Sequence, residues 1–372
     1  MTILHIITEL DKMYGAQRHV IEAINNHLNN GYHCMVITGK KGTVSAMIEA
    51  MGVKVVAISS IKNSYNIVHD ALAIPALIGA IEQLNPSLVV SHSSKASVVA
   101  RIACAITKTP NIFTVHGWAF EKGVPPLQYY LGKITEQLLK PLTDQYYCVS
   151  AYTAAYGIEQ LSLDTNKVHI CPNLHVPALT HRFVPKPLSN NVLMVAEFRR
   201  QKDHVTAILA IEHLVYVQQM KHLHFTFVGD GKRRQAMELL IAEKQLGNYI
   251  TIAGETNEID AYYAACDLVI LPSLYEGLPI SLIEALREGK PIIASDVGGI
   301  NEIVQPGING FLTEVGNYEQ LATQIVTCYN ELLLLQFGAN SWRIYQEKYD
   351  YQTIVQQMNA ILHKAIRLSK YA

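Results

Sequence analysis

The chain has 372 residues, of which 49% are hydrophobic and 16% are charged, and its formal net charge is −1. This length suits two domains of ordinary size, each with a buried core. A charge balance so close to zero produces no overall field that would attract nucleic acid. No apolar run approaches the roughly 20 residues that span a bilayer, and no signal-peptide pattern opens the sequence. We therefore expect a cytoplasmic protein without a nucleic-acid partner, whose only membrane contact is peripheral.

The six cysteines and fifteen histidines form no metal-binding or disulfide pattern by spacing. The cysteines are widely separated with no C-x-x-C pair, and the histidines include no H-x-x-x-H pair. This pattern predicts no metal site and no bound cofactor, and it is typical of a reducing compartment.

The first half of the chain alternates short apolar segments with amphipathic ones. The apolar segments predict strands at Ile3–Ile7, His33–Thr38, Val53–Ile58, Leu88–Ser91, Ile112–Val115 and Gln145–Val149. The amphipathic segments predict helices at Gln17–Asn29, Ala71–Leu84, Ala96–Ala105 and Leu127–Lys140. Such alternation is typical of a doubly wound parallel sheet with right-handed crossovers.

The same pattern starts again after residue 190. Strands are predicted at Val192–Ala196, Phe225–Val228, Ile250–Ile252, Leu268–Leu271 and Ile292–Ala294, with helices between them. Residues 174–190 contain three prolines and no clear period, which indicates a linker. We therefore predict an α/β protein with two Rossmann-like domains, residues 1–180 and 190–350, that face a cleft.

Residues 268–299, LVILPSLYEGLPISLIEALREGKPIIASDVGG, form a predicted strand, loop, helix and second strand. The loop follows the carboxyl end of a parallel strand, which is where open α/β sheets bind ligands. Glu276 precedes the helix and Glu284 lies inside it. Free backbone N–H groups at a helix N-terminus favour an anion such as a diphosphate. This stretch is therefore our main candidate for a ligand site.

Three loops of the first half follow predicted strands and carry candidate residues. Gly15 lies where a glycine lets a phosphate approach the backbone, although a plain tight turn has the same pattern. Lys95 follows two serines that suit a helix N-cap as well as a ligand. His116 stands at the carboxyl end of a strand and is followed by glycine. Trp118 and Tyr129 mix with lysines, a pattern that suits a membrane interface or a half-buried helix.

In the second half, the loop after the first predicted strand contains Arg199, Arg200 and Lys202. Fixed cations of this kind stabilise a leaving diphosphate, which gains negative charge in the transition state. Gly229 and Gly254 end two further predicted strands, where they form either nucleotide-binding loops or ordinary turns.

Several of these motifs together resemble one enzyme family. Glu276 and Glu284 form an E-x7-E pattern within E-G-L-P-x-S-x-x-E-A-L, and D-V-G-G-I-x-E follows. Gly15-Ala16-Gln17, the S-S-K-A segment and His116-Gly117 also match. The chain thus resembles the retaining, nucleotide-sugar-dependent glycosyltransferases of the "group 1" type, family 4. The resemblance implies a GT-B fold, in which residues 1–180 face the acceptor, residues 190–350 bind the donor, and a helix within 351–372 packs back on the first domain.

The resemblance also implies residue roles. Glu284 would hold the ribose, Glu276 the donor sugar, and His116 the transferred sugar near the reacting carbon. Lys202 and Arg199 would neutralise the diphosphate. The remaining implied donor contacts are Gly15, Gly229, Gly254, Gly277, Leu278 and Ser281, and the implied acceptor contacts are Lys95, Trp118 and Tyr129. Glu197 stands where the family has arginine, which leaves Arg199 and Arg200 as alternatives for that charge.

The implied activity is retaining, metal-independent hexosyl transfer with no cofactor. The implied donor is a nucleoside-diphosphate sugar, most simply a UDP-sugar. The implied acceptor is a lipid-linked oligosaccharide or glycan in capsule, exopolysaccharide or O-antigen lipopolysaccharide biosynthesis, at the cytoplasmic face of the inner membrane. Two alternatives remain open, a nucleotide-sugar 2-epimerase and a non-catalytic GT-B module of a polysaccharide assembly complex. Hydride transfer is disfavoured because no G-x-G-x-x-G follows the first strand.

Overall fold

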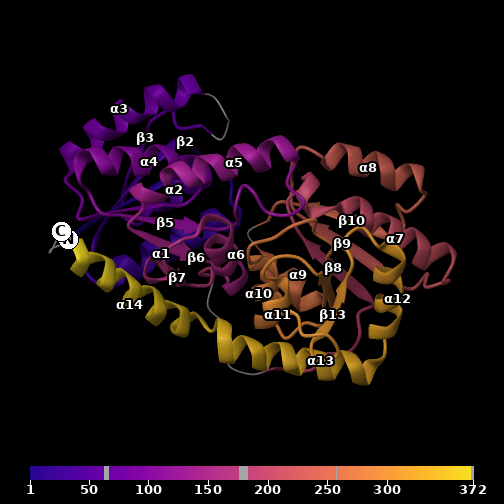
Figure 1. Ribbon diagram of the computed structural model, residues 1–372. Coiled ribbons are helices and arrows are strands. Elements are labelled where there is room, and N and C mark those ends of the chain that lie inside the picture. The colour runs from indigo at the N-terminus through magenta and orange to yellow at the C-terminus, as the bar shows by residue number, and fades with distance from the viewer. Residues whose placement is uncertain (63–66, 176–182, 257, 370–372) are drawn as a thin grey trace. The chain divides into compact units, whose positions relative to one another are not determined.

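The computed structural model describes residues 1–62, 67–175, 183–256 and 258–369 (Figure 1). The chain divides into two compact units, one made of Met1–Val176 with Tyr351–Ala372 and the other of Pro177–Asp350. Residues 176–182 of the predicted linker and residues 370–372 of the predicted terminal helix lie outside the described residues.

The first unit contains a seven-stranded parallel sheet in the order β3-β2-β1-β4-β5-β6-β7. The strands are β1 (Thr2–Leu10), β2 (His33–Lys41), β3 (Lys54–Ala57), β4 (Leu88–Ser91), β5 (Asn111–Val115), β6 (Gln145–Cys148) and β7 (Val168–Ile170). The strand order reverses between β1 and β4, which makes their carboxyl ends a topological switch point. The edge strand β7 was not predicted because its three residues are partly buried or exposed and give no apolar run.

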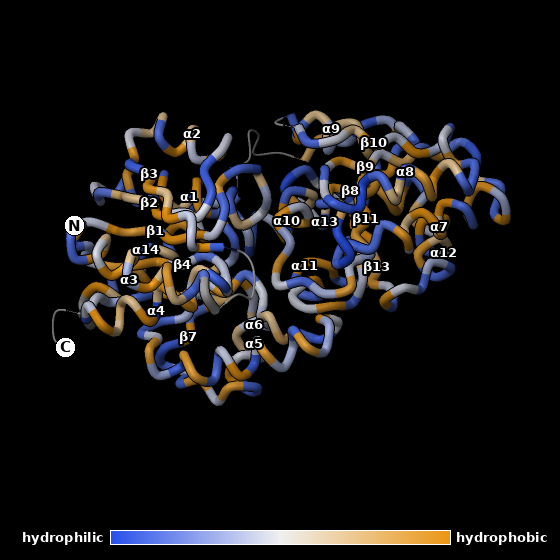
Figure 2. The backbone as a smooth tube through the Cα atoms, turned by 90° about the horizontal axis from the view of Figure 1, so that it is seen from above, coloured by the Kyte–Doolittle hydropathy of each residue, from blue (hydrophilic) through white to orange (hydrophobic). Residues whose placement is uncertain are grey.

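Helices cover both faces of this sheet, as β1 shows by alternation: Ile3 packs with α1 and α14, whereas Leu4 packs with α3 and α4. Figure 2 shows the hydrophobic strands enclosed by mixed helices. The helices are α1 (Gly15–Asn29), α2 (Thr43–Ala50), α3 (Ile67–Leu84), α4 (Ser94–Thr107), α5 (Pro126–Leu139), α6 (Ala151–Leu161) and α14 (Tyr351–Ser369), with short 3-10 turns at Lys140–Leu142 and Thr165–Lys167.

The terminal helix α14 belongs to the first unit by its packing. Ile354, Met358 and Leu362 are buried against strand residues of the sheet. The Tyr147 hydroxyl donates to the backbone carbonyl of Met358 at 3.3 Å. The Asn26 amide donates to Asn359 Oδ1 at 2.8 Å. The chain therefore returns, after the second unit, to complete the core of the first (Figure 1).

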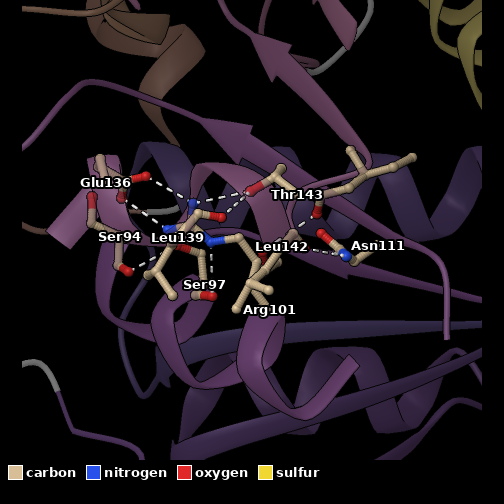
Figure 3. A network of polar contacts seen from close by, with 10 residues as sticks. Ser94, Ser97, Arg101, Asn111, Glu136, Leu139, Leu142 and Thr143 are labelled. Atoms are coloured by element: carbon tan, nitrogen blue, oxygen red, sulfur yellow. Dashed lines mark hydrogen bonds and ion pairs between the residues drawn. The ribbon is translucent and has the colours of Figure 1, made fainter. Parts of the chain in front are cut away.

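A buried ion pair fastens α5 to α4 (Figure 3). The guanidinium of Arg101 donates to both oxygens of Glu136, at 2.8 and 2.9 Å, and to Thr143 Oγ1 at 3.2 Å. It also donates to the carbonyl and the hydroxyl of Ser97, both at 3.1 Å. The side chains of Arg101 and Glu136 are 0% and 4% exposed. Every donor of this planar fork therefore has an acceptor, which is what a buried guanidinium needs.

The second unit contains a six-stranded parallel sheet in the order β10-β9-β8-β11-β12-β13. Its strands are β8 (Asn191–Val195), β9 (His224–Val228), β10 (Ile250–Gly254), β11 (Leu268–Leu271), β12 (Ile292–Ser295) and β13 (Gly310–Thr313). Its helices are α7 (His204–Tyr216), α8 (Arg234–Glu243), α9 (Ile259–Ala265), α10 (Ile280–Arg287), α11 (Ile300–Ile303), α12 (Tyr318–Cys328) and α13 (Glu331–Ile344), with a 3-10 turn at Arg200–Lys202 and a π-turn at Tyr345–Tyr349. The switch point lies between β8 and β11.

In the described part of the chain, no helix is both long enough and apolar enough to cross a membrane. All six cysteines are buried and free.

Candidate functional site

The two loops that follow β8 and β11 meet at the switch point of the second unit. The Leu274 amide donates to the Gln201 carbonyl at 2.8 Å, and the Gln201 side chain donates to the Tyr275 carbonyl at 2.7 Å. Between these bonds, the Lys202 ammonium pairs with the Glu276 carboxylate. Parallel neighbouring strands bring their carboxyl ends to one sheet edge, so the fold itself joins these two predicted residues.

The Lys202–Glu276 pair is largely removed from water, with side chains 14% and 6% exposed. Ser273 Oγ donates to Glu276 Oε1 at 2.8 Å and fixes the carboxylate further. Removing two charges from water costs free energy, and such pairs are weak sources of stability. A ligand-binding role for this pair stays a prediction, which its place at the switch point supports.

The loop after β12 packs directly on this site. Gly298 has φ +57°, and a Cβ there would lie 1.6 Å from the Glu276 carbonyl oxygen. The Gly299 amide donates to the Gly277 carbonyl at 3.0 Å. Only glycine at residue 298 therefore allows this close approach. Leu278 is buried, so its side chain packs inside the unit, and the predicted ligand contact of its backbone stays a prediction.

Glu284 lies in α10, one turn beyond the N-cap residue Pro279. Its side chain is buried and accepts a hydrogen bond from the Tyr263 hydroxyl at 3.2 Å. The same hydroxyl lies 2.7 Å from the Ser281 carbonyl. Burial and the nearby Glu284 charge hold the pKa of Tyr263 well above its ordinary range, so the phenol remains a donor. Nothing in the spacing of Tyr263 relates it to Glu284, so a local sequence pattern does not predict this contact.

The loops after β9 and β10 join the same sheet edge. The Phe198 amide donates to the Asp230 carbonyl at 3.0 Å, and the Gly229 amide donates to the Gly254 carbonyl at 2.8 Å. Gly229 has φ +145°, and a Cβ there would lie 2.2 Å from the Ala196 carbonyl oxygen. Gly229 therefore has a steric reason to be glycine and lies beside the start of the loop that carries Lys202, whereas Gly254, with φ +76°, lies beside Gly229.

Arg199 is exposed and pairs with Glu197 Oε2 at 3.4 Å. Glu197, which stands where the family has arginine, thus pairs with Arg199. Arg200 is also exposed. Lys202 is the cation of this loop that contacts Glu276, and Arg199 lies on its solvent side.

In the first unit, His116 follows β5 directly. Its Nδ1 donates to Asn173 Oδ1 at 3.0 Å, which leaves Nε2 unprotonated. Nε2 is buried and has no hydrogen-bond partner among the described residues. Burial lowers the pKa of His116 to about 4, so the imidazole is neutral at physiological pH. Asn173 was not singled out from the sequence; its distance of 57 residues from His116 gives no signal.

His116 belongs to a cluster with four buried histidines: His19 and His92 lie beside its ring, and His5 and His27 extend the cluster from His92. His5 lies in hydrogen-bonding contact with His92 at 2.9 Å and with His27 at 3.2 Å. One ring nitrogen each of His19, His92 and His116 lies within 4.8 Å of the others, a spacing that a metal ion could bridge. The backbone amide of Leu174, however, donates to His19 Nδ1 at 3.0 Å, which favours the tautomer with a proton on Nε2. The expectation of no metal stays a prediction.

This histidine cluster predicts acid lability. The unfolded imidazoles take up protons below about pH 6.5, whereas burial lowers the folded pKa of both His27 and His116 to about 4. The unfolded state therefore binds more protons as pH falls, and each group removes up to about 1.4 kcal/mol of stability per pH unit in this window. The free energy of unfolding, measured with urea, should fall between pH 7 and pH 4, and it should fall less steeply with pH in His27→Gln. If His27→Gln shows the same pH dependence as the exposed control His222→Gln, the assignment is contradicted.

The predicted acceptor-side residues have other partners in the structure. Trp118 is buried, donates from Nε1 to the Thr153 carbonyl at 2.8 Å, and packs on Phe113. Its expected acceptor contact is therefore corrected: the aromatic run after β5 turns inward to fill the core. Lys95 pairs with Asp70 at 2.9 Å. Tyr129 is half-buried.

Gly15 is exposed and forms the first residue of α1, with Tyr14 as the N-cap. The backbone at this position is exposed, and a phosphate contact there stays a prediction.

Two parallel α/β units, each with polar loops at a switch point, place those loops where open α/β sheets bind their ligands. Residues 13–174 match the family "Glycosyltransferase Family 4", and residues 181–333 match "Glycosyl transferases group 1". These two matches follow one another and together take in most of both units. The chain therefore belongs to the glycosyltransferases of group 1 and family 4.

Relatives and solved structures agree with this assignment. One relative is the UDP-Gal:alpha-D-GlcNAc-diphosphoundecaprenol alpha-1,3-galactosyltransferase of Escherichia coli, 23% identical over 86% of this chain and 86% of its own. Another is the O-antigen biosynthesis glycosyltransferase WbnH of Escherichia coli, 29% identical over 81% of this chain and 82% of its own. The Anabaena protein Alr3699/HepE, solved with UDP-glucose, superposes with a TM-score of 0.79 at 21% identity, covering 97% of this chain and 99% of that one. The predicted GT-B fold is confirmed.

Proposed function

We propose that this glycosyltransferase moves a hexosyl group, with retention, from a UDP-sugar to a lipid-linked oligosaccharide in cell-surface polysaccharide biosynthesis. The observation that carries the proposal is the buried Lys202–Glu276 pair at the switch point of the second unit, with Glu284 fixed nearby in α10. A cation and two oriented carboxylates suit the diphosphate, the sugar and the ribose of such a donor.

Each donor group has a matching residue in this proposal. Lys202 leaves Glu276 to meet the donor diphosphate, and Glu276, still held by Ser273, then accepts hydrogen bonds from sugar hydroxyls. Glu284, oriented by Tyr263, accepts from the ribose hydroxyls. The backbone around Gly229, Gly254, Gly277 and Ser281 borders the nucleotide, and Arg199 adds positive charge from the solvent side.

The chemical step breaks the bond between the anomeric carbon and the diphosphate oxygen while an acceptor hydroxyl attacks from the same face. The hydroxyl proton moves to the departing diphosphate oxygen. Lys202 stabilises the charge that develops on this leaving group. The neutral His116 supports the sugar as its ring gains positive charge, with Nδ1 held by Asn173. No residue has to act as a covalent nucleophile, unlike in retaining glycosidases. The proposal requires no metal.

The acceptor class is supported by the relatives. The name of the Escherichia coli galactosyltransferase specifies a sugar-diphosphoundecaprenol acceptor, and that of WbnH specifies O-antigen biosynthesis. We extend these names to a lipid-linked acceptor for this chain, used at the cytoplasmic face of the inner membrane.

Donor binding tests the proposal. Saturation-transfer NMR and thermal shifts should be measured in EDTA against UDP-, GDP-, ADP- and CMP-sugars. We expect a UDP-sugar to bind, and Glu284→Gln to weaken binding while the exposed control Glu243→Gln does not. Loss of binding in EDTA alone would contradict metal independence. Absence of binding by every donor would overturn the donor site and favour a non-catalytic module.

A further inference from the structure

The helix α5 carries an apolar stripe on its outer surface. Five large side chains, Leu127, Tyr130, Leu131, Ile134 and Leu138, are between 43% and 73% exposed. Their spacing, i, i+3, i+4, i+7 and i+11, places them on one side of a helix over a length of about 17 Å. The buried residues of α5 are Gly132, Glu136 and Leu139. The pattern is therefore reversed relative to an ordinary surface helix, which buries its apolar side.

The opposite side of α5 is fixed to the unit, so the helix cannot rotate to bury its stripe. Glu136 receives both guanidinium bonds of Arg101, at 2.8 and 2.9 Å (Figure 3). A Cβ on Gly132 would lie 2.9 Å from Ala119, which shows how closely α5 approaches the loop before it. Rotation of α5 would expose an ion pair and open this contact. The outward stripe is thus a stable feature of the folded unit.

Within residues 121–142, the charges that reach the surface have one sign. The two acidic side chains of this segment, Glu121 and Glu136, are both buried, and the nearest exposed carboxylates in the sequence are Asp144 and Glu159. The basic side chains of this segment reach the surface: Lys122 is exposed, and Lys133 and Lys140 are half-buried. The ammonium groups of Lys133 and Lys140 donate to neutral acceptors, the Gln160 amide and the Leu161 carbonyl, both at 2.9 Å. Their positive charge is therefore available to an anionic partner.

We propose that α5 docks this unit on a bilayer that contains anionic phospholipid. The stripe enters the boundary between headgroups and acyl chains, and the lysines meet lipid phosphates. This inference deepens the proposed function and rests on it only for the lipid-linked nature of the acceptor. It assigns the membrane contact to α5 and not to Trp118, which is buried.

Charge also argues against a second copy of this chain as the occupant. A two-fold contact through α5 would bring Lys122, Lys133 and Lys140 of both copies to one rim, with no exposed carboxylate of 121–142 to meet them. Like charges across an interface oppose association. An anionic bilayer presents the opposite charge to the same residues.

Vesicle sedimentation of the full chain, without donor or acceptor, tests the docking surface. Wild-type protein should bind phosphatidylcholine vesicles that contain phosphatidylglycerol, and Leu127→Gln/Ile134→Gln should lower the partition coefficient by about tenfold or more. The matched control is Leu72→Gln/Ile106→Gln, which changes equally exposed side chains of α3 and α4 and should bind as wild type. The variant Lys122→Gln/Lys133→Gln should weaken binding to anionic vesicles and leave binding to neutral vesicles unchanged.

Three results would overturn the docking surface. They are no vesicle binding by the wild type, equal loss in the control pair, or concentration-dependent self-association that disappears in the stripe variant. Circular dichroism of each variant checks that the unit remains folded. The vesicle assay contains no sugar donor, so its outcome does not depend on donor binding. The docking surface and the proposed function can therefore fail separately.

Discussion

Replacing Lys202 with methionine is expected to lower turnover by about 10²–10³-fold, the usual cost of removing one fixed charge donor from a developing anion. The diphosphate leaving group loses its cation, and Glu276, only 5% exposed, is left without a charged partner. The UDP-sugar should bind more weakly for the same reason. Steady-state kinetics with donor titration measures both effects.

The control for this variant is Lys221→Met, which removes an exposed lysine of the same unit away from the switch-point loops. It should leave turnover unchanged. If Lys202→Met transfers sugar at the wild-type rate, the diphosphate site lies elsewhere. If Lys221→Met loses as much activity, the loss reflects the net charge of the second unit and not the position of Lys202.

Replacing Arg101 with leucine is expected to destabilise the first unit by about 3–5 kcal/mol, because Glu136 is left buried without its cation. The double variant Arg101→Leu/Glu136→Leu removes both charges and should recover much of the loss. Urea unfolding followed by tryptophan fluorescence measures both stabilities. In a Trp342→Phe background, Trp118 is the remaining tryptophan and reports on the first unit alone.

Donor binding provides a second readout for Arg101→Leu. The proposed donor loops belong to the other unit, so UDP-sugar binding should persist below the unfolding transition. A double variant less stable than the single variant would contradict the account, because it would show that an unpaired, buried Glu136 carboxylate costs the unit no stability.

The sequence predicted the sheets well because buried parallel strands are continuous apolar runs. The run Leu268–Leu271 forms β11, and the polar loop after it lies at the switch point as expected. The link between Lys202 and Glu276 followed from that topology once both loops were placed at strand ends. Strand order, and with it the switch point, is a property of chain crossovers that a local pattern carries only indirectly.

The parts that the sequence did not predict depend on contacts between distant segments. Tyr263 meets Glu284 and Asn173 meets His116 through packing of separate elements. The histidine cluster likewise gathers side chains from β1, α1 and the loops after β4 and β5, which share no spacing. Trp118 was misplaced because an aromatic residue after a strand looks the same whether it faces a ligand or the core.

The most direct measurement of the central claim is the stereochemistry of transfer. The protein should be incubated in EDTA with a UDP-hexose, chosen by the donor-binding screen, and a synthetic sugar-diphosphoprenol acceptor. Proton NMR of the product then reads the new anomeric coupling. We predict an α-linked product from an α-linked donor, formed about 10²–10³-fold more slowly by Lys202→Met. A β-linked product would contradict retention. If the wild-type protein is saturated with donor but releases only free sugar or leaves the donor unchanged, transfer to this acceptor class is contradicted.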